Sequence, residues 1–259
     1  MLSLVIPTYR ERENLEPLLT RLKAVRAVLS EPIEVLIVDD QSPDGTAQHA
    51  QRLLSQSGLG RVVEHHGKRD LGLAVREGVR HARGDLIGFM DADLSHPPEL
   101  LPTLVAAVRS GNEVAIASRY VKGGGIANWP WSRRVLSRLA NRLTEPLVHV
   151  ADATSGYFVC RASVLNASEW HPKGYKVLLE LLARGCLHET QEVPYYFRDR
   201  QRGVSKLGMR TLALYSRQLV ALYYDRRCYP YRHRRGSGTS SDSSPAGGLP
   251  AEKIVDAHA

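Results

Sequence analysis

The chain has 259 residues, of which 43% are hydrophobic and 24% charged; this is the composition of an ordinary globular protein with one domain of about 200 residues or more. No apolar run approaches the roughly 18 to 20 residues that cross a bilayer, and the N-terminus lacks the marks of a signal peptide, so we expect a cytoplasmic protein. Residues 226–235 carry five of the eight excess positive charges, which favours a local anionic surface over a nucleic acid as the partner, since nucleic-acid binding spreads basic residues over a folded face.

Short β-rich runs alternate with segments of helical periodicity along the first half of the chain. Such alternation predicts an α/β fold, with a mostly parallel sheet covered by helices on both faces. Pro97 and Pro98, followed by Glu99, suit the first turn of a helix. The predicted strands are 2–6, 33–38, 61–64, 85–90 and 113–118. The predicted helices are 12–29, 44–56, 71–83 and 98–110.

The second half of the chain alternates less regularly up to residue 207, and a last amphipathic helix is predicted over residues 208–225. On a helical projection its apolar face holds Met209, Leu212, Ala213, Ser216, Leu219, Val220 and Tyr223. Beyond Gly236 the chain is rich in Gly, Ser, Pro and Ala, which predicts disorder. We therefore predict a catalytic domain over 1–207, a helix with a basic segment over 208–235, and a disordered tail over 236–259.

Acidic residues follow the second and fourth predicted strands. In open α/β sheets ligands bind outside the carboxyl ends of the strands. Asp91 and Asp93, separated by one residue, can share a hard divalent cation such as Mg²⁺ together with substrate phosphates. Asp39 and Asp40 can accept hydrogen bonds from a ribose or a base, although capping of the next helix is an alternative role that Asp44 fills better. Acid-x-acid triplets are frequent in solvated loops. It is the position of Asp91 and Asp93 at a strand end that favours a metal site here.

Basic residues form the third group of candidates. Arg119 ends the fifth predicted strand, Arg133 follows Trp131-Ser132, and the segment 197–207 holds Arg200 and Lys206 around Gly203. Guanidinium groups bind phosphates bidentately, and lysine binds them as a point charge. The chain has no glycine-rich phosphate loop, no H-E-x-x-H pattern and no G-x-S-x-G elbow, so a nucleotide would be held by side chains and a metal.

These motifs resemble those of glycosyltransferase family 2 with the GT-A fold, and within it the dolichyl- or polyprenyl-phosphate mannose synthases. Two blocks are specific to that branch: Asp-Asp-Gln-Ser-Pro-Asp-Gly-Thr at 39–46 and Asp-Ala-Asp-Leu-Ser-His-Pro at 91–97. The resemblance runs in order over roughly residues 2 to 210. The other matching segments are 7–14, 118–120, 131–134, 152–156 and 203–207.

The resemblance implies transfer of mannose from GDP-mannose to dolichyl or polyprenyl phosphate, with inversion and with Mg²⁺ or Mn²⁺ as cofactor. It assigns the guanosine to Pro7, Tyr9, Glu11, Val38 and Asp40. It assigns the metal and the diphosphate to Asp91 and Asp93, with the backbone of Met90 and Ala92 nearby, and further contacts to diphosphate or sugar to Arg119, Arg200 and Lys206. The acceptor phosphate falls to Arg133 and Ser137.

Two positions depart from the family pattern. Arg10 stands where the family usually has asparagine, which puts the shape of the nucleotide pocket in doubt. Ser95 stands where some relatives place a glutamine that binds the metal, so we expect water to complete the coordination here. The site has no paired general base and needs none, because a phosphomonoester, with a second pKa of about 6, is already largely deprotonated at neutral pH.

The acceptor that the resemblance implies is a membrane lipid, so we expect the chain to reach a membrane surface. We expect helix 208–225 and the arginines after it to form an interfacial anchor on the cytoplasmic face, with packing of that helix on the catalytic domain as the alternative. A small membrane accessory subunit is a further possible partner. Three other functions stay open: transfer from UDP-glucose or another donor to a polyprenyl phosphate, a non-catalytic sugar-nucleotide- or membrane-binding protein, and a dehydrogenase, which the missing glycine fingerprint disfavours.

Overall fold

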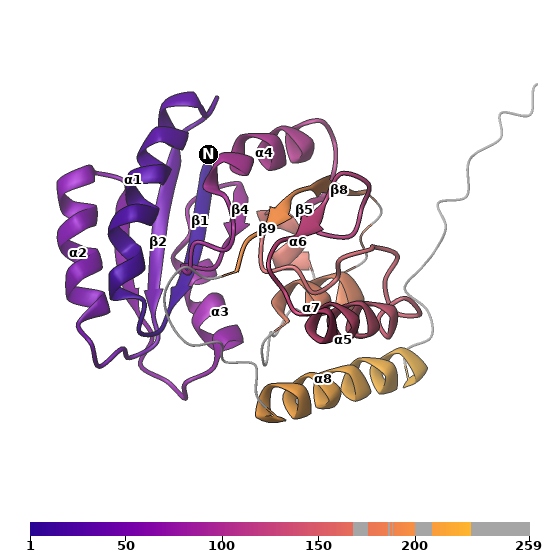
Figure 1. The fold of residues 1–259 in the computed structure, drawn as a ribbon. Coiled ribbons are helices and arrows are strands. Elements are labelled where there is room, and N and C mark those ends of the chain that lie inside the picture. The colour runs from indigo at the N-terminus through magenta and orange to yellow at the C-terminus, as the bar shows by residue number, and fades with distance from the viewer. Residues whose placement is uncertain (168–175, 186, 188, 200–208, 229–259) are drawn as a thin grey trace, which may run out of the picture.

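A seven-stranded sheet with helices on both faces forms the body of the protein in the computed structural model, which describes residues 1–167, 176–185, 187, 189–199 and 209–228 (Figure 1). The strand order is β3-β2-β1-β4-β7-β5-β8, and all neighbouring strands are parallel except for β7, which is antiparallel to β4 and β5. The strands are β1 (Leu2–Thr8), β2 (Ile33–Asp39), β3 (Gly60–Glu64), β4 (Leu86–Phe89), β5 (Val114–Ser118), β7 (Phe158–Arg161) and β8 (Thr190–Pro194). A two-stranded parallel ribbon joins β6 (Gly125–Ile126) to β9 (Tyr196–Phe197).

The helices of the first half follow the predicted positions closely. They are α1 (Arg12–Val28), α2 (Thr46–Ser57), α3 (Leu71–His81), a 3₁₀ turn η1 (Pro98–Leu100) and α4 (Leu101–Arg109). The second half adds α5 (Trp131–Arg142), α6 (Ala162–Ala167), α7 (Val177–Arg184) and α8 (Met209–Cys228). Two of these starts have a local cause: the Asp70 carboxylate caps α3 by accepting from the Leu73 N–H, and Asp44 accepts from the backbone and the hydroxyl of Thr46 at the start of α2.

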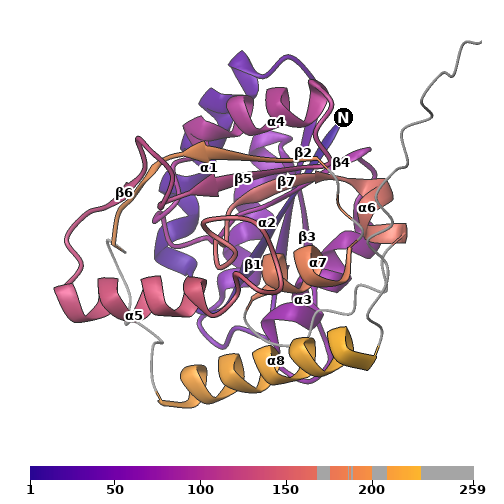
Figure 2. The same ribbon diagram turned by 90° about the vertical axis from the view of Figure 1, so that its right-hand side faces the viewer.

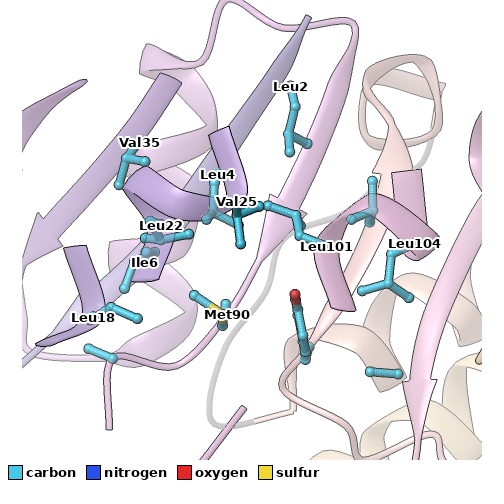
Figure 3. Close-up of a cluster of buried hydrophobic side chains, with 14 of the residues drawn as sticks. Leu2, Leu4, Ile6, Leu18, Leu22, Val25, Val35, Met90, Leu101 and Leu104 are labelled. Carbon is cyan, nitrogen blue, oxygen red and sulfur yellow. The ribbon is translucent and has the colours of Figure 1, made fainter. Parts of the chain in front are cut away.

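The sheet separates two apolar clusters, which is why its central strands are continuous hydrophobic runs. On one face Leu4 and Ile6 of β1 pack with Leu18 and Leu22 of α1 and with Leu104 of α4 (Figure 3). The other face packs the remaining side chains of the same strands against α3, α6 and α7. The predicted α/β fold with helices on both faces is therefore confirmed, and its strand ends are held rigidly.

Helix α8 packs against the rest of the domain, which is the alternative to the interfacial anchor expected from the sequence, and both ribbon views show it along the same end of the molecule as α5 and α7 (Figures 1 and 2). Tyr215, Leu219 and Leu222 are buried in a third cluster with Leu147, Val148 and Leu179. The Tyr215 hydroxyl donates to the Ala140 carbonyl of α5 at 2.7 Å. Among the described residues, no helix is long and apolar enough to cross a membrane.

The predicted apolar face of this last helix is only partly the buried one. Leu219 is buried as predicted, whereas 69% of Val220 is exposed and the buried face turns toward Tyr215 and Leu222. Gln218 also points inward and donates to the Lys176 carbonyl. Since α8 is aromatic and aliphatic nearly all round, only tertiary contacts decide which side is covered. The division at residue 207 and the tail over 236–259 stay predictions, because 200–208 and 229–259 lie outside the described residues.

Candidate active site

The candidate residues gather at one edge of the sheet, where β1, β2, β4 and β5 end and the loop before β7 begins. Thr8 pairs with Asp39 in the β1–β2 register, and the Asp40 N–H donates to the Thr8 carbonyl. Beyond the Val5–Phe89 pair that ends the β1–β4 ladder, the chain continues from β4 into Asp91-Ala92-Asp93. A Cβ added at Gly156, in the loop before β7, would lie 2.8 Å from Asp91 Oδ2. Glycine at this position therefore lets the loop approach the carboxylate closely.

The two carboxylates of the Asp91–Asp93 pair have different surroundings. Asp93 is buried, and its Oδ1 accepts hydrogen bonds from the Ser95 N–H at 3.1 Å and from the Ser95 hydroxyl at 2.5 Å. The side chain of Asp91 is 44% exposed. Leu94, between Asp93 and Ser95, adopts a left-handed backbone, with φ of 61°. Ser95 thus orients one carboxylate, while the other reaches solvent where a ligand can approach.

His96 is a buried residue that lies against the Asp91 carboxylate. Its ring is buried among Tyr157, Tyr195 and Phe197. Its Nδ1 lies 3.0 Å from the Tyr195 hydroxyl, and its Nε2 lies 3.4 Å from Asp91 Oδ2. If the hydroxyl donates to Nδ1, the proton of neutral imidazole lies on Nε2 and faces the carboxylate. No local sequence pattern predicts the contact between His96 and Asp91, because His96 lies in a loop that ends in Pro97 and Pro98.

The predicted guanosine residues lie at the ends of β1 and β2. Asp40 is buried and its Oδ1 lies 2.9 Å from His65 Nδ1. The Tyr9 hydroxyl accepts from Arg69, whose guanidinium also stacks over the Tyr9 ring at 4.6 Å. Glu11 begins α1, where its Oε2 accepts from the Asn14 amide. Asp39 is used within the turn, since its oxygens accept from Thr8 and from the Ser42 N–H.

Four predicted contact residues are part of the sheet or its immediate continuation: Pro7, Val38, Met90 and Ala92. Val38, Met90 and Ala92 are at most 2% exposed, so only their backbone can reach a ligand. Val38 is paired with Pro7 on β1 and with Val63 on β3. Its side chain packs in the core against the Cα of Gly78, where an added Cβ would meet Val38 Cγ2 at 2.7 Å. A guanosine contact by the Val38 side chain would therefore require this packing to open.

Arg119 forms a buried bidentate ion pair with Asp152 across 33 residues of sequence. Its Nε donates to Asp152 Oδ2 at 2.7 Å and its NH2 group to Oδ1 at 2.7 Å, with a further bond to the Thr154 hydroxyl. Burial opposes charge on both groups, but the pair more than offsets it: the pKa of Arg119 is raised and that of Asp152 is lowered. The guanidinium lies over Tyr120, Trp129 and Phe197 at 5.3 to 5.9 Å. Contact of Arg119 with the diphosphate or sugar stays a prediction.

Arg133 and Ser137 lie on the inner face of α5. The Arg133 guanidinium stacks on the Trp129 ring at 3.9 Å and its NH1 group donates to Asp199 at 3.1 Å. Its Nε is buried and donates to none of the described residues. The Ser137 hydroxyl accepts from Tyr120 at 2.7 Å, so its own proton remains available. The structure therefore brings the two predicted acceptor residues onto one face, whereas Arg200 and Lys206 lie outside the described residues.

Lys176 is a site residue that the sequence analysis missed. It precedes α7, and its ammonium donates to the Thr154 carbonyl at 3.0 Å, beside the Arg119–Asp152 pair. Burial and the nearby Arg119 charge lower its pKa to about 8. A lysine between an α/β edge and a short helix gives no sequence signal, because its partners are 22 or more residues away.

Replacing Lys176 with methionine tests this buried charge. The unfolded chain holds the lysine proton up to its ordinary pKa near 10.4 and the folded chain only to about 8, so wild-type stability rises with pH between these values. We expect Lys176→Met to be more stable than wild type below about pH 8, by at most about 3 kcal/mol, and the gain to vanish near pH 10.4. Urea unfolding of both proteins across this range measures it. A difference independent of pH would show that Lys176 is not buried as an ammonium.

The sheet order, the antiparallel β7 and the carboxylate pair after β4 define an α/β protein of the GT-A type. The family model described as Glycosyl transferase family 2 matches residues 3–168. The chain therefore belongs to glycosyl transferase family 2.

Relatives and solved structures agree with this assignment. Dolichol-phosphate mannosyltransferase of Pyrococcus furiosus is 41% identical over 85% of this chain, which spans 63% of that relative's length. The Saccharomyces cerevisiae protein of the same name is 35% identical over 85% of the chain and 86% of its own length. Polyprenol monophosphomannose synthase of Mycolicibacterium smegmatis is 39% identical over 79% and 80%. Glucosyl-3-phosphoglycerate synthase from Mycobacterium tuberculosis, solved with Mn²⁺ and UDP-glucose, has a TM-score of 0.59 at 20% identity over 87% and 79%, a likeness of fold alone.

Proposed function

We propose that the chain transfers mannose from GDP-mannose to dolichyl phosphate or another polyprenyl phosphate, with inversion at the anomeric carbon. The observation that carries this proposal is the identity of 35% to 41% with relatives named for that activity. These matches extend over most of the chain, and the described residues proposed for the donor and the metal lie near one edge of its sheet. Pro7, Tyr9, Glu11 and Asp40 would hold the guanosine.

The residues present fit a divalent cation such as Mg²⁺ or Mn²⁺. Asp91 and Asp93 offer hard oxygen ligands at a strand end, and Asp91 reaches solvent. Among the described residues no group of three or more His, Cys, Asp and Glu could hold a metal, which suits a cation that uses one or two carboxylates together with substrate phosphates. When bound, such a cation neutralises the charge that develops on the departing diphosphate. His96 and Ser95 would keep the two carboxylates in position.

The acceptor phosphate fits the inner face of α5. The unused Nε of Arg133 is a buried N–H group directed by stacking on Trp129, and it can donate to a phosphate oxygen. Ser137 can donate its hydroxyl proton to the same group. The phosphate needs no base, because it is largely ionised at neutral pH, so the protein has only to align it behind the anomeric carbon. Arg200 and Lys206 would complete the cationic side of the site.

A peripheral position on the membrane follows from the outer face of α5. Trp131, Val135 and Leu139 are 78%, 52% and 52% exposed there. Arg134, Arg138 and Arg142 are exposed on the same helix, which has no acidic residue. An amphipathic helix with arginines beside aromatic and aliphatic residues lies in the headgroup region of a bilayer. Its inner face carries Arg133 and Ser137, so the lipid's phosphate would enter the site directly from the membrane.

Introducing a negative charge on the apolar face of α5 tests this attachment. We expect Val135→Glu and Leu139→Glu each to weaken binding to anionic vesicles at least about tenfold, because a carboxylate must enter the apolar headgroup boundary. Vesicle co-sedimentation measures the effect, and thermal unfolding should change little since both side chains are exposed. Val28→Glu is the matched control, because Val28 is 72% exposed at the end of α1. Equal binding by all three variants would exclude α5 as the contact.

The activity itself is tested with GDP-mannose, Mg²⁺ or Mn²⁺, and a short polyprenyl phosphate. We expect mannose in the lipid fraction and free GDP in equal amounts, and no lipid product after chelation of the metal. UDP-glucose in place of GDP-mannose, and a polyprenol without phosphate in place of the acceptor, are the control substrates. Hydrolysis of the donor without a lipid product would refute the assigned acceptor, and preference for UDP-glucose would refute the assigned donor.

A further inference from the structure

A cavity of about 300 Å³ lies beside α5, away from the carboxylate pair. It is lined by Tyr120, by Arg138, Asn141, Arg142 and Glu145 from α5 and the turn after it, and by the loop at 150–151. Its volume is at the lower end of the range of about 300 to 1,000 Å³ that is usual for small-molecule sites. None of the residues assigned to donor or metal lines it.

The polar groups of this cavity form an unusual set. Arg138 and Arg142 are four residues apart on α5, so their guanidinium groups lie on the same side of the helix. Asn141 is only 6% exposed; its amide donates to the Ser137 carbonyl at 3.2 Å, but its Oδ1 accepts from none of the described residues. A buried acceptor without a donor costs about 1 to 3 kcal/mol. The cavity therefore offers two cations for an anion, and one of its lining residues, Asn141, has a buried amide oxygen that lacks a donor among the described residues.

The loop at 150–151, which lines the cavity, adjoins the active site. The Ala151 N–H donates to Glu192 Oε2 at 2.8 Å, and the next residue is Asp152, the partner of Arg119. On the other side the Tyr120 hydroxyl donates to Ser137. Tyr120 thus separates the cavity from the face assigned to the acceptor phosphate. The cavity is consequently a second site, close to the first but built from different side chains.

We propose that this cavity binds the headgroup of an anionic phospholipid that carries free hydroxyls, such as phosphatidylglycerol or phosphatidylinositol. The two arginines would take the phosphodiester, and a headgroup hydroxyl would donate to Asn141 Oδ1 or to Glu145. The exposed apolar side chains of α5 lie on the same helix, so a lipid in the bilayer can reach the cavity. The inference rests on the membrane attachment proposed above. It goes further, because it assigns a specific headgroup to a surface that would otherwise bind any anionic lipid through its charge.

Vesicle binding of the full chain tests the proposal. Phosphatidylcholine vesicles would carry equal mole fractions of phosphatidylglycerol, phosphatidylinositol or phosphatidylserine, which all have one net negative charge but differ in hydroxyls. We expect wild type to bind the first two several-fold more tightly than the third, and Arg138→Ala and Arg142→Ala to abolish that preference. Arg134→Ala removes one charge from the same helix without touching the cavity, so it should weaken binding to all three vesicles equally and keep the preference.

The remaining outcomes separate the two proposals. Equal binding of wild type to all three anionic vesicles would overturn the headgroup site and leave the membrane surface of α5 intact. Absence of binding to every vesicle would overturn both. Soluble glycerol 1-phosphate and inositol 1-phosphate test whether the cavity binds a free ligand. If either binds the protein without vesicles and loses affinity in Arg142→Ala, the cavity binds a free phosphate ester rather than a lipid. Loss of the preference in Arg134→Ala as well would show that charge density, and not the cavity, sets it.

Discussion

Asp93→Asn should lower the rate of mannosyl transfer by about 10² to 10³-fold while leaving the fold unchanged. The change removes one negative charge from the carboxylate pair proposed to hold the cation and the diphosphate, and loss of one preorganised electrostatic contact has effects of about this size. Asparagine keeps an oxygen in place of Asp93 Oδ1, so the two hydrogen bonds from Ser95 can persist. Initial rates with GDP-mannose and a polyprenyl phosphate measure the loss.

Two companion variants make this result specific. Asp85→Asn makes the same substitution at the opposite end of β4, where the carboxylate pairs with Arg109 and the N-terminus, and should leave the rate unchanged. Ser95→Ala removes only the hydroxyl bond to Asp93 and should raise the metal concentration needed for half-maximal rate more than it lowers the maximal rate. Mn²⁺ binding by electron paramagnetic resonance gives a second readout. Transfer by Asp93→Asn at a rate near that of wild type would exclude the carboxylate pair as the metal and diphosphate site.

The sheet and the first four helices could be predicted because each of these elements has a local cause. Hydrophobic runs of strand length alternate with amphipathic segments, and Asp70 and Gly58 mark helix ends. β1 extends two residues further than predicted, through Pro7 and Thr8. Proline lacks an N–H for a sheet ladder, but Pro7 lies beyond the last β1–β4 pair, at Val5–Phe89. The absence of an N–H on Pro7 therefore removes no hydrogen bond between β1 and β4.

The rest of the site depends on contacts that no local pattern encodes. β7 enters the sheet antiparallel between β4 and β5, and this places Asp152 beside Arg119 and Gly156 beside Asp91. Lys176 reaches the same region from the start of α7. The acidic motif and the arginines could be recognised as groups suited to a metal and to phosphates. The sequence could not show which of these arginines is already paired with an acidic residue. Arg119 is such a case, because its partner follows 33 residues later.

Arg10 shows how the structure clarifies a departure from the family pattern. Its backbone is left-handed, with φ of 58°, and asparagine adopts this conformation more readily than other non-glycine residues. The usual asparagine can therefore be understood as a conformational choice in a turn at the end of β1. Its N–H donates to the Ser42 hydroxyl at 2.9 Å, a contact that any residue can make. Arginine here places a cation near Tyr9, at 5.3 Å from the ring, rather than changing the course of the chain.

Asp152→Leu should destabilise the protein by about 3 to 5 kcal/mol, because it leaves the buried Arg119 charge without its partner. Arg119→Met should have a similar cost for the converse reason. The double variant should recover much of this stability, since an apolar pair of similar volume replaces a buried ion pair with little net loss. Urea unfolding of the four proteins in a double-mutant cycle measures the coupling between the two residues.

Activity of the double variant then separates structure from catalysis. If Arg119 only holds the loop at 152–156 beside Asp91, a double variant that is refolded and stable should regain a large part of the wild-type rate. We expect the opposite: stability returns, and transfer stays at least about 10²-fold slower. The reason is that the guanidinium beside Trp129 and Phe197 is a positive charge fixed in a buried part of the site, where it would act strongly on a diphosphate. The charge of Arg119 would thus be needed for the reaction, and Asp152 for keeping that charge in a place that water does not reach.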